Sequence, residues 1–176
     1  AFAGSPSIRS PLTEDRKFLL KALRETSTDS VEQGGTRIED ALFKVIDKLV
    51  SDSPTNTDLI LITDGDDLGS FPKKSIDIIN EKGLRMIIIG LGDSRRGARI
   101  PQDDGFIKYK GREVWSKHYP DYLQKLSDQF THGVYINIST NPFPLKRLLH
   151  QLRANWRGEE RIIGETLVYT EGAPLF

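Results

Sequence analysis

The chain has 176 residues, of which 37% are hydrophobic, and its 25 basic side chains balance its 25 acidic ones. This length suits one domain with a proper core, and the zero net charge gives no general reason to bind nucleic acid or a membrane surface. The chain has no cysteine, which excludes disulfides, thiolate metal sites and cysteine nucleophiles. No apolar run approaches the ~18 residues of a membrane-spanning helix, and no stretch has the pattern of a signal peptide.

The first part of the chain predicts two helices and a strand. Residues 11–25 are expected to form a helix with Thr13 as its N-cap. Residues 34–50 predict an amphipathic helix entered through Gly34, Gly35 and Thr36. Its apolar face comprises Ile38, Ala41, Leu42, Val45, Ile46 and Leu49. The continuous apolar run 59–63 then predicts a strand that is covered on both faces.

The rest of the chain continues this alternation. Residues 70–83 predict a helix with Pro72 in its first turn and Gly83 at its end. A buried strand is expected in 84–92, a long polar loop in 93–105, and a hairpin in 106–115 that turns at Lys110–Gly111. A helix (119–130), a strand (133–138), a last helix (144–156) and an extended tail follow. This order predicts the α/β class: a doubly wound, mostly parallel sheet with helices on both faces.

In the stretch LILITDGDD (59–67), a predicted buried strand is followed directly by a cluster of carboxylates. Ligands of open parallel sheets bind at the carboxyl ends of the strands, where Asp64 closes this strand and Asp66 and Asp67 follow. Hard oxygen ligands of this kind suit Mg²⁺ or Mn²⁺, and Gly65 permits a close backbone turn. The alternative is a solvated acidic loop that caps the next helix.

The second candidate element is the helix entrance at Gly34, Gly35 and Thr36. The threonine could be a hydroxyl metal ligand, part of a phosphate cradle, or a plain N-cap. The P-loop spacing with its lysine is absent, which argues against nucleotide binding. The histidines His118, His132 and His150 lie in unrelated elements without metal-ligand spacing, and ordinary surface or core roles are expected for them.

Taken together, the glycine-glycine-threonine entrance, the amphipathic helix and the buried strand that ends in Thr-Asp-Gly resemble a von Willebrand factor type A (VWA) domain. The segments AFAGSPSIRSPLTEDRKFLLKAL, GLGDSRRGARIP and THGVYINI are similar to the bacterial BatA/BatB-like branch, which is associated with MoxR-type ATPases. The resemblance covers nearly the whole chain.

The resemblance implies a metal-ion-dependent adhesion site (MIDAS) that is built from three loops. It assigns metal ligation to Thr36 and Asp64, with Gly34, Gly35, Gly65 and Asp66 as support. The remaining Asp-x-Ser-x-Ser loop is not in this sequence, so we expect an N-terminally truncated chain with weak affinity for Mg²⁺. Residues 1–158 are then a partial VWA domain, and residues 159–176 are an extended tail that is juxtamembrane in the parent protein.

The function that the resemblance implies is a metal-dependent protein-binding module rather than an enzyme. The cation, Mg²⁺ or Mn²⁺, would capture a carboxylate from a partner protein. A MoxR-type AAA+ ATPase or other VWA proteins are the expected partners, with no role for nucleic acid. The setting would be the bacterial cell envelope, with an inner-membrane anchor outside this chain and a role of the Bacteroides aerotolerance kind.

Four other interpretations stay open. The chain could be a VWA-like scaffold with an incomplete, inactive metal site. Asp64-x-Asp66 after an apolar strand could belong to a haloacid-dehalogenase-type phosphatase, although Leu68 stands where Thr or Val is expected. Finally, the basic residues of 142–158 could face an acidic partner or anionic lipid, and the loop 95–99 with the hairpin could shape a partner surface.

Overall fold

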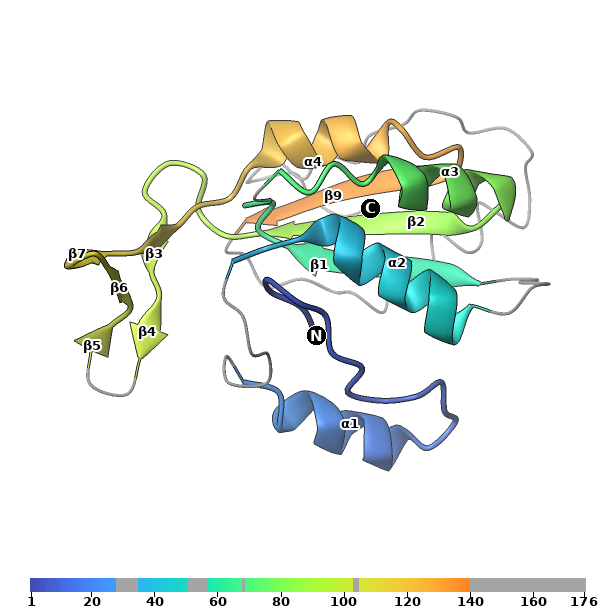
Figure 1. Ribbon diagram of the computed structural model, residues 1–176, viewed down its shortest axis with the longest axis horizontal. Coiled ribbons are helices and arrows are strands. Elements are labelled where there is room, and N and C mark those ends of the chain that lie inside the picture. The colour runs from blue at the N-terminus through green and yellow to red at the C-terminus, as the bar shows by residue number, and fades with distance from the viewer. Residues whose placement is uncertain (28–34, 51–56, 68, 103–104, 140–176) are drawn as a thin grey trace, which may run out of the picture. The chain divides into compact units, whose positions relative to one another are not determined.

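The computed structural model describes residues 1–27, 35–50, 57–67, 69–102 and 105–139 (Figure 1). The chain divides into two compact units. The first contains Ala1–Thr57 and Asp67–Leu84, and the second contains Asp58–Asp66 and Arg85–Phe176. The helix expected in 144–156 and the tail 159–176 lie outside the described residues. No helix in the described part of the chain is both long and apolar enough to cross a membrane.

The first helix of the first unit is α1 (Arg16–Arg24), and its N-cap is Asp15. The Asp15 carboxylate accepts hydrogen bonds from the amides of Lys17 and Phe18 at 2.9 and 3.1 Å. The prediction that Thr13 is the cap is therefore wrong. Thr13 instead accepts a hydrogen bond from the Asp15 amide at 3.0 Å, which holds the capping residue in place.

Helices α2 (Ile38–Leu49) and α3 (Lys73–Glu81) pack against each other in the first unit. Helix α2 buries four members of its predicted apolar face and leaves the other two half-buried; the four are Ile38, Ala41, Leu42 and Ile46. Helix α3 begins at Lys73, three residues after the start of the predicted range 70–83, and Pro72 is its N-cap rather than a residue of its first turn. Gly83 follows the helix with a φ of 62°, the left-handed conformation that ends helices.

The second unit is built on a three-stranded parallel sheet. Its strands are β1 (Asp58–Thr63), β2 (Arg85–Leu91) and β9 (Gly133–Ser139), in the order β1-β2-β9. Strand β2 is central and buries five consecutive residues, as predicted for a parallel sheet. Strand β1 differs from the prediction because Ile60 and Ile62 are 43% and 50% exposed. It lies at the edge of the described sheet, so its side chains alternate between buried and exposed.

Helix α4 (Pro120–Ser127) packs on β2 and β9 of the same unit (Figure 1). It buries Leu123 and Leu126, and Pro120 occupies its first turn as predicted. A helix on a parallel sheet confirms the α/β class. The finer expectation, a doubly wound sheet with helices on both faces, stays a prediction.

Between β2 and α4 the chain forms three small antiparallel pairs that stand beyond the carboxyl ends of the strands (Figure 1). They are β3 (Ala98–Arg99) with β8 (Trp115–Ser116), β4 (Pro101–Gln102) with β5 (Gly105–Phe106), and β6 (Lys108–Tyr109) with β7 (Arg112–Glu113). The predicted turn at Lys110–Gly111 is confirmed. The prediction that 93–105 is all loop is wrong, because strands of two residues show no hydrophobic periodicity.

A ring of backbone hydrogen bonds joins the three pairs at their centre. The Ile107 amide donates to the Ile100 carbonyl at 2.9 Å, the Val114 amide to the Ile107 carbonyl at 2.9 Å, and the Ile100 amide to the Val114 carbonyl at 3.4 Å. These three residues are seven positions apart along the chain. We call residues 98–116 the triple-hairpin arm.

Candidate functional site

Asp64 lies directly after β1, at the carboxyl edge of the parallel sheet, and is half-buried. One carboxylate oxygen, Oδ1, accepts a hydrogen bond from the Asp66 amide at 3.1 Å. The other, Oδ2, accepts one from the Ser116 hydroxyl at 2.5 Å, and the Asp64 carbonyl accepts one from the Tyr119 amide at 2.8 Å. The residues around β8 and the start of α4 therefore fix the orientation of this carboxylate.

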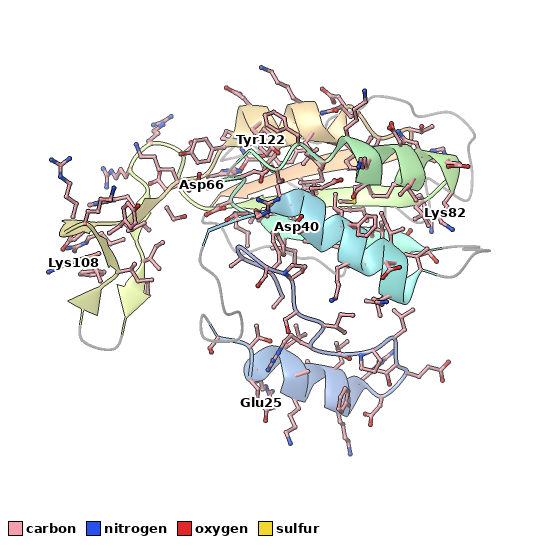
Figure 2. The ribbon with its side chains drawn as sticks, in the orientation of Figure 1. Glu25, Asp40, Asp66, Lys82, Lys108 and Tyr122 are labelled. Atoms are coloured by element: carbon pink, nitrogen blue, oxygen red, sulfur yellow. The ribbon has the colours of Figure 1, made fainter. Side chains whose placement is uncertain are left out.

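The loop after Asp64 depends on Gly65. Its φ of +82° is a conformation that side chains rarely adopt, and an added Cβ would lie 2.8 Å from Cγ of Leu123 on α4. Asp66, labelled in Figure 2, is half-buried in the same loop. The tight turn brings the Asp66 amide back to Asp64 and lets the backbone of Gly65 pack closely against Leu123 of α4.

Asp67 belongs to the first unit and has a structural partner there. Its carboxylate accepts from the Ser70 hydroxyl at 2.7 and 2.8 Å and, at 3.5 Å, from the Ile38 amide. Ser70 in turn accepts from the Glu39 amide at 3.1 Å. The acidic loop thus caps a helix, as the alternative interpretation held, but the helix is the preceding α2 rather than the following α3.

The glycine-threonine entrance lies in the first unit. Gly34 is outside the described residues, Gly35 is exposed with a φ of 93°, and Thr36 is half-buried. The N-cap of α2 is Arg37, so the interpretation of Thr36 as a plain N-cap is wrong. Asp64 belongs to the second unit, and the joint ligation of a metal by Thr36 and Asp64 stays a prediction. Among the described residues, no three His, Asp or Glu side chains form a group that could hold a metal ion.

Behind Asp64 lies a buried polar pair that the sequence patterns did not single out. His118 Nε2 and the Tyr135 hydroxyl are 3.0 Å apart, and the two residues are 3% and 5% exposed. They sit over Gly90 of β2, where an added Cβ would be 2.5 Å from His118 Nε2 and 2.8 Å from the Tyr135 hydroxyl. A glycine inside an apolar strand marks such a close approach, and it was the available signal for this pair.

Burial shifts both members of this pair toward their uncharged forms. Desolvation lowers the pKa of His118, while the negative charge of Asp64 and a hydrogen bond with the Gly92 backbone oppose the shift. Desolvation, and then the charge of Asp121, raise the pKa of Tyr135 to about 12. The pair is therefore neutral at pH 7 and shares a hydrogen bond without net charge.

The lowered pKa of His118 predicts a loss of stability in mild acid. The unfolded chain takes up a proton on this histidine near its ordinary pKa of about 6.5, whereas the folded chain does so only at lower pH. The stabilising contribution is thus present above pH 6.5 and is lost as the pH falls. We expect the urea midpoint to decrease more between pH 7.5 and 5.5 for the wild type than for His118→Gln. An NMR titration that places the pKa of His118 at or above its ordinary value would contradict this.

No family model and no curated protein matches the chain. Two solved structures are similar in fold. One is the conserved hypothetical protein BatB from Bacteroides thetaiotaomicron, with 20% identity and a TM-score of 0.77. The other is an aerotolerance-related membrane protein from Bacteroides fragilis with multiple mutations to serines, with 17% identity and a TM-score of 0.69. Each comparison covers 90% of this chain and 77% of the other chain. The chain therefore shares the fold of these two proteins.

Proposed function

We propose that the chain is a protein-binding module of the VWA type, in which a divalent cation at Asp64 captures a carboxylate from a partner protein. The position of Asp64 carries the proposal: it is a half-buried carboxylate at the carboxyl edge of a parallel sheet, with its orientation fixed by Ser116 and Asp66. The likeness in fold to BatB supports it. Such a site performs no covalent chemistry, so the proposed role is not that of an enzyme.

Asp64 fits a hard cation in its chemistry. A carboxylate offers about four acceptor positions, and each Asp64 oxygen accepts one hydrogen bond among the described residues, which leaves room for Mg²⁺ or Mn²⁺. The sequence resemblance alone assigns a further hydroxyl ligand to Thr36, and water and the partner would supply further oxygens. Because the sequence lacks the Asp-x-Ser-x-Ser loop, we expect this chain to bind the cation weakly.

A metal titration tests this proposal. Isothermal titration calorimetry with MnCl₂ is expected to give saturable heat for the wild type, no saturable heat for Asp64→Ala, and weaker binding for Thr36→Ala. The matched control is Asp77→Ala, which removes an exposed carboxylate from α3 and is expected to leave binding unchanged. Binding that survives Asp64→Ala would refute the assignment.

A second candidate function is a VWA-like scaffold with an inactive metal site. It is favoured by the lack, among the described residues, of any group of three acidic or histidine side chains fit to hold a metal. The absence of saturable heat with both MnCl₂ and MgCl₂ would support it.

We further propose a setting in the bacterial cell envelope. The aerotolerance-related neighbour is named as a membrane protein, which supports a membrane-associated parent for this chain. A MoxR-type AAA+ ATPase or another VWA protein as the partner, and a role in aerotolerance, rest on the sequence resemblance. Co-purification of the parent protein with such an ATPase from membrane fractions, lost with Asp64→Ala, is the corresponding observation.

A further inference from the structure

The tip of the β6–β7 hairpin combines positive charge with an exposed aromatic ring. Lys108, Lys110 and Arg112 are all exposed, and Tyr109 between them is 68% exposed. Figure 2 shows Lys108 in this arm, away from the sheet. Lys110 and Gly111 both have positive φ, 50° and 78°. Two such residues form a two-residue hairpin turn whose twist matches that of the flanking strands. The three cations are therefore presented on a defined turn.

The arm beneath the tip is held together by a stack around Arg99. Its guanidinium lies 3.9 Å from the centre of the Phe106 ring and 5.9 Å from that of Trp115, and it pairs with Glu113 at 3.5 Å. Together with the ring of backbone hydrogen bonds, this stack fixes the three pairs relative to one another. A rigid support lowers the entropy that the tip loses when it binds a partner.

Among the described residues of the arm, the cations of the tip outnumber the carboxylates. In the part of the arm that the structure describes, Glu113 is the one carboxylate, and Arg99 already pairs with it. Lys110 instead lies 5.3 Å from the centre of the Tyr109 ring. Asp103 and Asp104 fall outside the described residues. The tip thus offers three cations and an aromatic ring to a ligand of opposite charge.

The size of this patch favours a protein ligand over other polyanions. Nucleic-acid binders commonly contact about six to ten phosphates, and lipid-binding clusters contain about four to eight basic residues, whereas the tip has three. Tyrosine, tryptophan and arginine are the residues that most often dominate protein interfaces. Tyr109 and Trp115, which is 51% exposed, supply such aromatic surface on the arm.

The arm is also tied directly to Asp64. Ser116, at the end of β8, donates to the Asp64 carboxylate, and Tyr119, three residues later, donates to the Asp64 carbonyl. We propose that the hairpin tip 108–112 binds an acidic segment of the same partner protein whose carboxylate is captured at Asp64. This rests on the proposed function for the identity of the partner, but the tip's preference for acidic peptide stands on its own residues.

The test measures binding of a fluorescein-labelled peptide of alternating glutamate and glycine by fluorescence anisotropy, without added metal. The wild type is expected to bind this peptide with an affinity that falls as the salt concentration is raised. It is expected not to bind the matching glutamine–glycine peptide. Replacing Lys108, Lys110 and Arg112 by Gln is expected to weaken binding about tenfold. The matched control replaces the exposed residues Lys73, Lys74 and Lys125 by Gln, and it is expected to bind as the wild type does.

Two outcomes would overturn the proposal. One is equal binding by the tip variant and the wild type, with circular dichroism showing that both are folded. The other is tighter binding to phosphatidylglycerol vesicles or single-stranded DNA than to the acidic peptide. Asp64→Asn separates the two proposals, because it is expected to remove metal binding and keep metal-free peptide binding. Failure of the MnCl₂ titration would therefore refute the metal site and leave the result for the tip intact.

Discussion

Gly90→Ala is expected to reduce the free energy of unfolding by about 3 kcal/mol, the upper end of what overpacking a core costs. The backbone of Gly90 is compatible with alanine, so the whole effect comes from crowding. The new methyl group would lie 2.5 Å from His118 Nε2 and 2.8 and 2.9 Å from two atoms of the Tyr135 side chain. Both of these side chains are buried. Urea unfolding followed by circular dichroism measures the loss.

Gly83→Ala is the matched control for this substitution. No atom lies within 4 Å of the Cβ it would add, but its φ of +62° disfavours a side chain, so about 1 kcal/mol is expected. Combining Gly90→Ala with His118→Ala should recover part of the crowding cost. A loss no larger for Gly90→Ala than for Gly83→Ala would show that the pair above Gly90 can move aside. Displacement of His118 would also move its neighbours Ser116 and Tyr119, which donate hydrogen bonds to Asp64. Gly90→Ala is therefore expected to weaken Mn²⁺ binding as well.

Arg85→Ala is the second substitution with a large expected effect, about 3 kcal/mol of lost stability. Arg85 and Asp58 begin the paired strands β2 and β1 opposite each other, and their side chains meet at 2.5 Å. The Asp58 side chain is 5% exposed and that of Arg85 is 20% exposed. Removal of the arginine takes the ion-pair cation away from a carboxylate that is shielded from water, and the loss of this attraction accounts for most of the lost stability.

A double-mutant cycle tests this reasoning. Asp58→Ala together with Arg85→Ala should be more stable than Arg85→Ala alone, because the double variant no longer buries the Asp58 carboxylate. Arg37→Ala is the matched control: it breaks an ion pair with Asp40 whose side chains are 51% and 39% exposed, and it should change stability by less than about 1 kcal/mol. Equal losses for Arg85→Ala and Arg37→Ala would mean that burial does not strengthen the first pair.

The sequence predicted the elements whose signals are local. The apolar runs of β2 and β9, the stripe of α2 and the Lys110–Gly111 turn all depend on neighbouring residues, and each lies where it was expected. Thr13 was mistaken for the cap of α1 because Asp15, two residues on, is an equally good capping residue.

The features that the sequence missed depend on residues far apart in the chain. Asp67 caps α2 through an amide 29 positions away, and Ser116 reaches Asp64 across 52 positions. No periodicity encodes such pairs. The edge exposure of Ile60 and Ile62 likewise depends on which strands lie beside β1, whereas their apolar character is the same in a central or an edge strand.

The ring at Ile100, Ile107 and Val114 has a consequence for the order in which the chain folds. Its hydrogen bonds join residues within a short stretch of chain. In contrast, paired residues of β1 and β2 are 27 positions apart, and those of β2 and β9 are at least 47 apart. Local contacts form faster than non-local parallel pairings, because less loop-closure entropy opposes them. The triple-hairpin arm is therefore expected to fold ahead of the sheet, so that Ser116 is already in position when β1 brings Asp64 to it.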